Sequence, residues 1–281
     1  MPYGPIVRRV VVVILDGLRP DAIGRFELST LGEMMSAGAW TLRAVTVAPS
    51  VTTSAVTSLV TGVSPATHGL AGDRLVIPRA KSHLVTLPRH LGAHSLPSSA
   101  FMAEVPAIFR GISVRVGRRL GLASLSLAGS CAAEVLAAAR RALAEQRTGT
   151  IIMHWPDADH AGHRDGWMSA AYAAGCRRLD EALDGLVQAA DDGHTLIVAL
   201  ADHGGGGCAP NDHDGDHPLN RTIPILLYGP GVAARELGPA TLVDVPPTIL
   251  RALGVSVPES YEGRILREAF VTDERSAAAV A

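Results

Sequence analysis

Three apolar runs that each end in acidic or imidazole side chains constrain the fold of this chain more than any other feature. The runs cover residues 10–15, 150–153 and 195–200, and a fourth apolar run covers 222–228. Continuous runs of this kind are typical of strands that are buried on both faces of a parallel sheet. The sequence therefore predicts four strands of a buried sheet.

Helical patterns lie between these runs, recognised by apolar residues at helical spacing or by strong helix formers. The predicted helices cover residues 28–38, 51–60, 131–145, 170–190 and 244–253. Strands that alternate with helices indicate the α/β class. We therefore predict a mostly parallel central sheet with helices on both faces.

The chain has 281 residues and shows no internal repeat. We expect a single domain over residues 1–281. Residues 71–130 carry arginine and apolar residues without a clean period. We expect this segment to form small connecting elements, as a cap or insertion within the domain.

Composition limits which binding partners and which cellular compartment we expect. The formal net charge of −2 gives no reason to expect a nucleic acid or an anionic membrane as partner. The three cysteines are widely spaced and form neither a disulfide framework nor a CxxC zinc motif. The first apolar run has six residues, too few for a signal peptide core or a membrane span. We expect a cytoplasmic protein without membrane contact, and the sequence leaves the oligomeric state open.

The ten residues 154–163 hold an unusual density of ionisable groups. These groups are His154, Asp157, Asp159, His160 and His163. Such side chains are costly to bury unless they are paired or bound to a metal. The stretch is therefore either an exposed polar loop or a metal site. Two of its groups, at positions 159 and 163, are four residues apart and can face one ion.

Further candidate ligands follow the other strands. Asp16 ends the first run, Asp202 and His203 follow the run at 195–200, and residues 211–217 read Asn-Asp-His-Asp-Gly-Asp-His. Functional groups of open α/β sheets gather at the carboxyl ends of strands. Oxygen and imidazole ligands without thiolate suit zinc, manganese or iron. Seven or eight ligands in all indicate two ions.

Thr52 stands where Pro49-Ser50 meets the start of a predicted helix. The N–H groups at a helix start form a ready anion site. A hydroxyl that is bound to a metal there becomes a nucleophile at neutral pH. Alone, a threonine in this position is more often a helix cap.

Taken together, these segments resemble the alkaline phosphatase superfamily, and within it the nucleotide pyrophosphatase/phosphodiesterase branch. The matching segments are VVVILDGLRPD (11–21), PSVTTSAVTSLVTGVSPATHGL (49–70), DADHAGHRDG (157–166), ADHGG (201–205), HDGDHPLNRTIPILLYGPGV (213–232) and VDVPPTILRALGV (243–255). The resemblance does not cover residues 71–130.

The resemblance implies an alkaline-phosphatase-like fold and a set of roles. One divalent ion would be held by Asp16, Thr52, Asp202 and His203, and the other by Asp159, His163 and a histidine of 213–217. The spacing to Thr222-Ile223-Pro224 favours His213 over His217 as that histidine. The ions would be Zn²⁺, with Mn²⁺ or Fe as alternatives.

The reaction that the resemblance implies is hydrolysis of a small-molecule phosphoric ester, as in phosphodiesterases and nucleotide pyrophosphatases. Thr52 would attack phosphorus and form a phospho-threonine intermediate, which water then hydrolyses. The other ionisable groups of 154–163 would support the ligands or the substrate (Asp157 and His160) or be structural (His154). Arg74 and Arg164 are candidates for phosphate contacts, or ordinary surface charges.

One departure from the family pattern leaves alternatives open. The branch usually continues its nucleophile motif as threonine, apolar residue, proline, asparagine, whereas this chain reads Thr52-Thr53-Ser54-Ala55. A phosphomonoesterase, a phosphonate hydrolase or a mutase of the same superfamily is the alternative. A metal-binding protein without activity is a further one. Neither Ser50 nor Thr52 begins the Cys/Ser-x-Pro-x-Arg pattern of sulfatases, which argues against that activity.

Overall fold

The computed structural model of the chain describes residues 4–70, 72 and 84–271. Its strands are β1 (Arg9–Leu15), β2 (Ala39–Val45), β3 (Ser98–Met102), β4 (Ser124–Leu127), β5 (Gly149–Trp155), β6 (Thr195–Leu200), β7 (Thr222–Tyr228) and β8 (Arg235–Glu236). They form one sheet in the order β4-β3-β5-β1-β6-β7-β2-β8.

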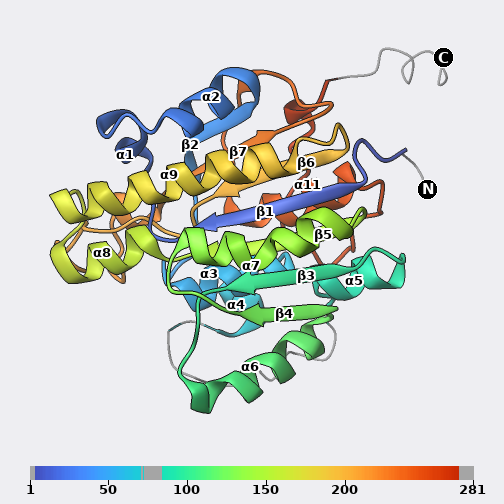
Figure 1. The fold of residues 1–281 in the computed structure, drawn as a ribbon, viewed down its shortest axis with the longest axis horizontal. Helices are drawn as coiled ribbons and strands as arrows, with labels where there is room; N and C mark the ends of the chain where they lie inside the picture. The colour runs from blue at the N-terminus through green and yellow to red at the C-terminus, as the bar shows by residue number, and fades with distance from the viewer. Residues whose placement is uncertain (1–3, 71, 73–83, 272–281) are drawn as a thin grey trace.

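The helices fill the connections between the strands. They are α1 (Pro20–Arg25), α2 (Ser29–Ala37), α3 (Thr52–Thr61), α4 (Pro65–His68), α5 (Leu87–Ala93), α6 (Ala107–Leu120), α7 (Ala132–Glu145), α8 (Asp157–Asp165), α9 (Ala170–Ala190), α10 (Pro218–Arg221) and α11 (Val245–Ala252), with short 3-10 turns at Leu242–Asp244 and Arg267–Ala269. Helices α2, α7 and α9 cover one face of the sheet, and α3 and α11 lie behind it (Figure 1). The predicted α/β class is confirmed.

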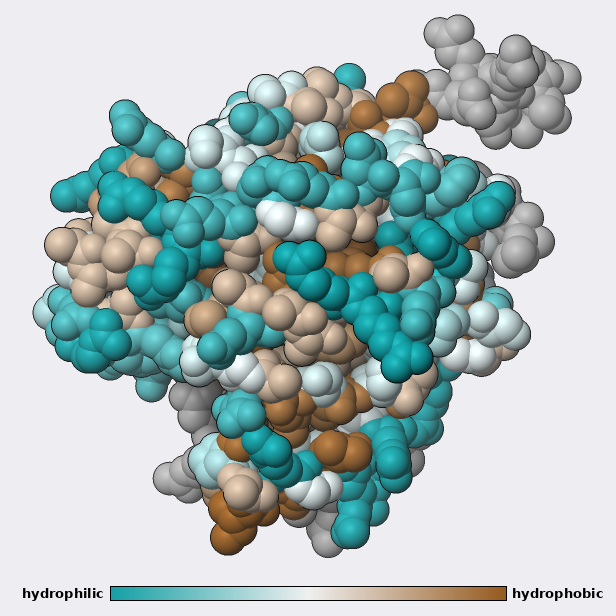
Figure 2. All heavy atoms as spheres, viewed as in Figure 1, coloured by the Kyte–Doolittle hydropathy of each residue, from teal (hydrophilic) through white to brown (hydrophobic). Residues whose placement is uncertain are grey.

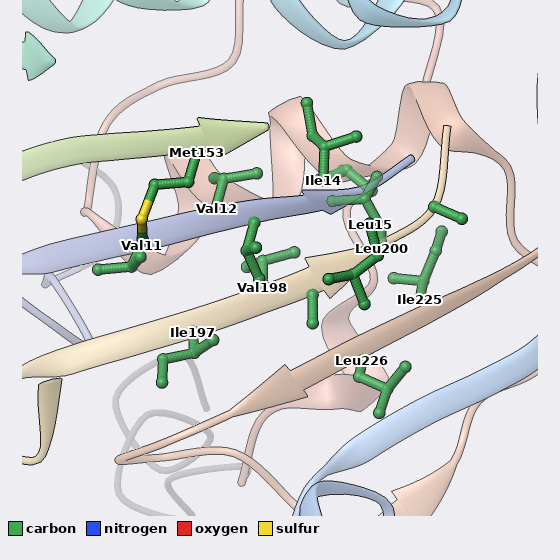
Figure 3. Packing of buried hydrophobic residues seen from close by; sticks show 14 of the residues in the cluster. Val11, Val12, Ile14, Leu15, Met153, Ile197, Val198, Leu200, Ile225 and Leu226 are labelled. Atoms are coloured by element: carbon green, nitrogen blue, oxygen red, sulfur yellow. The ribbon is translucent and has the colours of Figure 1, made fainter. Parts of the chain in front are cut away.

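The centre of the sheet is apolar on both faces. All seven residues of β1 and all six of β6 are buried. Figure 3 shows Val11 and Leu15 of β1 beside Val198 and Leu200 of β6. Burial of one such side chain contributes about 1.5–3 kcal/mol. This layer therefore fixes where the strands end, which is where the polar side chains begin.

Most of the sheet is parallel. β1 pairs in parallel with β5 and β6, and β3 pairs in parallel with β4 and β5. β7 runs antiparallel to both β6 and β2. The carboxyl ends of β5, β1 and β6 consequently meet at one edge of the sheet.

Residues 71–130 were expected to form small connecting elements, as a cap or insertion within the domain, and the described part, residues 84–130, contributes to the central sheet itself. This segment supplies β3 and β4, which extend the central sheet beyond β5. These two strands were not predicted because β3 reads Ser-Ser-Ala-Phe-Met and β4 reads Ser-Leu-Ser-Leu, and neither contains a continuous β-branched run. Arg74 and residues 73–83 lie outside the described residues.

Polar side chains cover much of the face seen in Figure 2, and apolar ones gather near β4 and α6 at its lower end. Within the described part of the chain, no helix has both the length and the apolar character that a membrane span needs.

Candidate metal centre

Three neighbouring strands bring their ends together. Ile14 of β1 pairs with His154 of β5 on one side and with Leu200 of β6 on the other. Asp16 therefore emerges from β1 beside Asp202, which follows β6. Their side chains are buried, with residue exposures of 4% and 1%. Two carboxylates thus meet at low dielectric, where their repulsion is strong.

Helix α8 supplies the next two groups. Asp159 and His163 are one helical turn apart on the same face, with Asp159 Oδ1 3.4 Å from His163 Nε2. The backbone N–H of Asp159 donates to the carbonyl oxygen of Asp16 at 3.0 Å. Gly17 allows this approach, because a Cβ there would lie 2.9 Å from the Asp159 Cα. The helix start is therefore tied directly to the end of β1.

Thr52 is the first residue of α3 and is half-buried. Its Oγ1 lies 3.1 Å from His203 Nε2. The hydroxyl stands at the positive end of a ten-residue helix. A negatively charged group beside Thr52 would be stabilised there.

The loop 211–217 contributes a fifth segment. His213 is buried, and the Ser50 hydroxyl donates to its carbonyl oxygen at 2.7 Å. His217 instead caps α10, where its Nδ1 accepts from the backbone N–H of Leu219 at 3.1 Å. Of the two histidines that the sequence left open, His213 is the one that joins the cluster.

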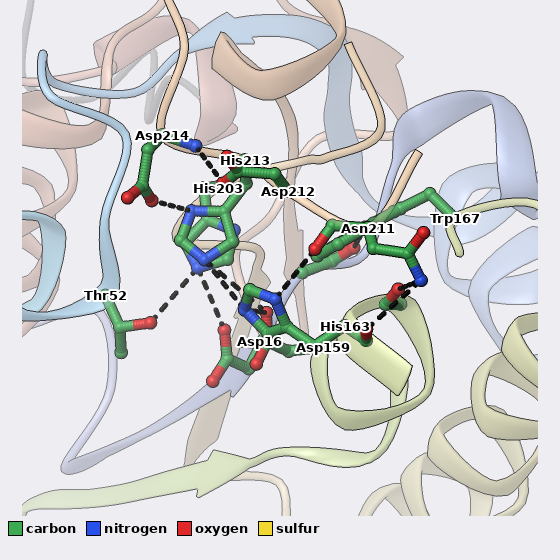
Figure 4. Close-up of polar contacts among 12 residues, drawn as sticks. Asp16, Thr52, Asp159, His163, Trp167, His203, Asn211, Asp212, His213 and Asp214 are labelled. Carbon is green, nitrogen blue, oxygen red and sulfur yellow. Dashed lines mark hydrogen bonds and ion pairs between the residues drawn. The ribbon is translucent and has the colours of Figure 1, made fainter. Parts of the chain in front are cut away.

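The first group in the cluster surrounds His203. His203 Nε2 lies 3.2 Å from Asp16 Oδ1 and 3.7 Å from Asp202 Oδ2. The Thr52 hydroxyl approaches the same nitrogen, as Figure 4 shows. The four residues predicted for one ion are thus brought together.

The second group contains Asp159, His163 and His213, whose potential ligand atoms all lie within 4.8 Å of one another. The ring of His213 also stacks on His203 at a centroid distance of 3.8 Å. Asp16, Asp159 and His203 form a further set within the same limit. The two groups are therefore adjacent, and Asp16 and Asp159 line their boundary.

Three histidines of the cluster share one orientation, with Nδ1 at a backbone carbonyl oxygen. The pairs are His203 with Gly204 (2.8 Å), His213 with Ser50 (2.8 Å) and His163 with Asn211 (3.0 Å). A carbonyl can only accept, so each Nδ1 carries a proton and each neutral ring presents its Nε2 lone pair to the cluster. The Nε2 atoms of His163 and His213 are only 3.1 Å apart. Two lone pairs at this distance call for a proton or a cation between them.

Buried carboxylate oxygens of the cluster also call for a proton or a cation. Asp16 Oδ1, Asp159 Oδ1 and Asp202 Oδ2 are buried and accept no hydrogen bond from the described residues. A buried unsatisfied polar atom costs about 1–3 kcal/mol, and more when it is charged. Metal-binding histidines commonly have the backbone support seen here. The donor set of carboxylates and imidazoles fits two divalent cations.

The protonation states reflect excess negative charge. Burial, followed by repulsion from Asp16, raises the pKa of Asp159 to about 8 and that of Asp202 to about 6. Burial lowers the pKa of His203, but Asp202 and Asp16 outweigh it and raise the value to about 10. Burial opposes ionisation of Asp16 as well, yet His154 and His203 hold its pKa well below the usual range. Without cations, protons neutralise the cluster.

One residue of the centre was missed from the sequence. His154, predicted to be structural, has its Nε2 3.2 Å from Asp16 Oδ2 and forms a possible ligand set with Asp16 and Asp202. Because β5 continues to Trp155, His154 lies within the strand. The register of β5 against β1 was the signal, and it is visible only in the sheet.

Two other residues of that stretch lie elsewhere. Asp157 was expected to support the ligands or substrate, but its oxygens accept from the backbone N–H of Ala132 at 2.7 Å and from Arg178 Nε at 2.9 Å. It therefore holds the start of α7 against α9. His160 is exposed on α8. Arg164, a candidate phosphate contact, pairs with Asp165 on the surface.

Two family models match the chain. The model of the Metalloenzyme superfamily matches residues 124–257, and that of Type I phosphodiesterase / nucleotide pyrophosphatase matches residues 10–94. Together the two matches include every residue of the two groups.

Curated relatives align with part of the chain. The catalytic subunit of GPI ethanolamine phosphate transferase 3 from Homo sapiens is 29% identical over 131 residues, which are 45% of this chain and 12% of that protein. The 2,3-bisphosphoglycerate-independent phosphoglycerate mutase of Cereibacter sphaeroides is 33% identical over 124 residues, 42% of this chain and 24% of that protein. The alignments thus span a quarter or less of these relatives.

A solved structure covers nearly the whole fold. Human ectonucleotide pyrophosphatase / phosphodiesterase 5 matches with a TM-score of 0.74 at 13% identity, over 94% of this chain and 100% of that one. The chain is thus an α/β protein with candidate ligands for divalent cations, and the match to the Metalloenzyme superfamily model agrees with that donor set. The fold is also similar to that of a protein in the alkaline phosphatase superfamily from Vibrio parahaemolyticus, with a TM-score of 0.68 at 16% identity over 96% of this chain and 72% of that one, in line with the resemblance seen in the sequence segments.

Proposed function

We propose that this chain is a two-metal phosphoric ester hydrolase of the phosphodiesterase or nucleotide pyrophosphatase type. The observation that carries the proposal is the convergence of unpaired carboxylate oxygens and Nε2 lone pairs beside a threonine hydroxyl at a helix start. The match to the phosphodiesterase family model over residues 10–94, which contain Asp16 and Thr52, supports the reaction type.

The proposed ions would each use one of the two groups. Asp16, Thr52, Asp202 and His203 would hold one ion, and Asp159, His163 and His213 the other. Zn²⁺ suits this donor set best, with Mn²⁺ or Fe as alternatives. When bound, such ions supply Lewis-acid stabilisation of the charge that develops on the attacking and leaving oxygens.

Thr52 provides the nucleophile. Its Oγ1 forms a bond to phosphorus while the ester oxygen opposite leaves, and the hydroxyl proton passes to solvent. The helix start of α3 stabilises the phosphoryl oxygens at this position. Water then attacks the phospho-threonine and restores the hydroxyl.

The substrate reaches the centre from the side of Thr52 and His163. Thr52 is half-buried and the His163 side chain is 46% exposed, whereas the side chains of Asp202 and His203 are at most 2% exposed. A small-molecule phosphate ester can therefore approach the hydroxyl, while the carboxylates beneath remain dry.

A second candidate is a phosphomonoesterase, phosphonate hydrolase or mutase. Ala55 motivates it, because the family's asparagine at this place is replaced by a methyl group that cannot hydrogen-bond a phosphoryl oxygen. The match to a phosphoglycerate mutase supports the same reading.

The test compares metal-loaded and metal-free protein on an aryl phosphodiester and an aryl phosphomonoester. Thr52→Ala should lower turnover about 10³-fold or more. Thr53→Ala is the matched control, since this neighbour on α3 is exposed and should keep wild-type turnover. The ratio of diester to monoester rates separates the two candidates.

Two results would contradict the proposal. If wild-type protein binds no divalent ion and turns over neither ester, the two-metal hydrolase is wrong. If it binds two ions per chain but leaves both esters intact, the chain is a metal-binding protein without this activity.

A further inference from the structure

Trp167 follows α8 and lies against the histidines of the second group of the metal centre. Gly166 ends α8 with a φ of +89°, and the next residue, Trp167, donates its backbone N–H to the Pro210 carbonyl oxygen at 2.8 Å. Trp167 is 7% exposed. The chain thus turns at the end of α8 and places a large ring inside the protein.

The polar edge of the indole reaches the end of β1. Trp167 Nε1 donates to the Gly17 carbonyl oxygen at 3.0 Å, and the Tyr172 hydroxyl donates to the same oxygen at 2.9 Å. Gly17 directly follows Asp16. Two donors on one carbonyl fix the peptide that carries the Asp16 side chain into the cluster.

The ring itself contacts the histidines of the second group. Its centroid lies 5.2 Å from that of His163 at an interplanar angle of 79°, and 5.8 Å from that of His213 at 73°. Both are edge-to-face arrangements, which aromatic rings favour. His163 comes from α8 and His213 from the loop 211–217, so one side chain positions ligands from two elements.

Three glycines make room for the ring. A Cβ at Gly162, Gly205 or Gly206 would lie 2.6, 2.1 or 2.7 Å from atoms of Trp167. These residues belong to α8 and to the segment that follows His203. The backbone on both sides of the cluster is therefore packed against the indole, which leaves the ring little freedom to move.

We propose that Trp167 is a positioning residue of the metal centre. Its ring holds His163 and His213 in the geometry that binds one ion, and its N–H holds Asp16, through Gly17, for the other. This inference rests on the proposed function, because the ions in question are those of the two-metal site.

The experiment titrates metal-free protein with Zn²⁺ by calorimetry. Trp167→Leu removes both the ring and the N–H, whereas Trp167→Phe keeps an aromatic ring against the histidines and removes only the N–H. Tyr172→Phe is the matched control, since it deletes the other donor to Gly17, and the Tyr172 ring packs against Phe26 and Trp167. A His163→Ala variant identifies which binding step belongs to the second group.

Loss of a supporting contact typically weakens metal affinity about 10–100-fold. Trp167→Leu should show this loss at both binding steps. Trp167→Phe and Tyr172→Phe should weaken only the step that His163→Ala leaves in place, and by similar factors. Circular dichroism checks that each variant is folded; if Trp167→Leu is not, the Phe variant decides.

Two outcomes would overturn the inference. One is wild-type affinity at both steps in Trp167→Leu, or in Trp167→Phe if only that variant folds. The other is a loss in Tyr172→Phe at the His163 step as large as that in Trp167→Leu. A wild-type protein that binds no Zn²⁺ would instead overturn the two-metal proposal together with this one.

Discussion

The centre of the sheet and its outer edge at β4 differ in how the chain uses burial. At the carboxyl ends of β1 and β6, two fully buried strands carry buried carboxylates and imidazoles without enough internal partners. At the outer edge, β4 has no fully buried residue, and α6 buries only Gly117. Ile108 of α6 is 83% exposed, and apolar surface gathers over this edge in Figure 2.

The difference indicates where the chain can keep charges that destabilise it. Unpaired buried carboxylates are tolerated only where a strong core outweighs their cost. The centre of the sheet supplies such a core around Asp16 and Asp202. The edge formed by β4 and α6 has little core of its own and carries no comparable cluster among its described residues.

The largest expected effect is at Asp202. Asp202→Asn should lower ester turnover about 10³-fold, because one charged ligand is lost. The same change should raise the melting temperature of the metal-free protein, since it removes a carboxylate that Asp16 repels. Kinetics and thermal unfolding measure both effects. Glu104→Gln, which breaks a surface pair with Arg110 near α6, should change neither; equal effects at both sites would erase the distinction between the regions.

A matched pair of truncations compares the two cores. Leu196→Ala in β6, at a fully buried position, should lower the free energy of unfolding by about 2–5 kcal/mol. Leu125→Ala in β4, at a half-buried position against α6, should cost about 1 kcal/mol. Denaturant unfolding of metal-free protein gives both values. Similar losses would show that the edge is as well packed as the centre.

The pH dependence of metal binding tests the charge cluster. The pKa of Asp159 is raised to about 8, so at pH 7 the metal-free carboxyl is mostly protonated and an ion must displace that proton. The affinity of the second group, Asp159 with His163 and His213, should therefore rise about tenfold per pH unit below pH 8 and level off above it, as far as the Asp159 proton alone is concerned. Calorimetry between pH 6 and 9, in buffers of different ionisation enthalpy, measures affinity and proton release. A flat profile would mean that no such proton is held.

The raised pKa of Asp159 also affects the stability of the metal-free protein. Because the folded pKa lies above the unfolded one, the folded metal-free chain binds more protons than the unfolded chain. Its stability should fall as pH rises from about 4 to 8, as far as Asp159 alone is concerned.

The smallest effect is expected at the outer surface. Ile108→Ser on α6 should change the free energy of unfolding by no more than about 0.5 kcal/mol and leave turnover unchanged. Equilibrium unfolding and the aryl ester assay check this. A larger loss would reveal packing at α6 that the exposure of Ile108 does not suggest.

Much of the metal centre could be predicted because the sequence patterns that indicate its strands and ligands are local. The strand of residues 195–200 and the helix of 170–190 were predicted with their observed bounds. The continuous apolar runs of β1 and β6 are easily recognised, and each is followed by its candidate ligands. Family resemblance then sorted the ligands into two groups, and the structure brings those groups together.

What the sequence did not reveal depends on neighbours in space. β4 is the edge strand and β3 lies between it and β5, and both consist of serine and apolar residues, so neither shows the continuous apolar run of the central strands. His154 was interpreted as structural, and Asp157 as a group that supports the ligands or the substrate. The sheet register instead turns His154 towards Asp16, and helix packing turns Asp157 towards Arg178.

The most direct test of the account is to trap the intermediate on Thr52. Metal-loaded protein is mixed with an aryl phosphodiester, quenched in acid within the first turnover, digested and analysed by mass spectrometry. We expect a peptide containing Thr52 that carries the phosphoryl group with its remaining ester, and no such adduct in Thr52→Ala. Turnover of the diester by wild-type protein without any adduct on Thr52, or with the adduct on another residue, would contradict it.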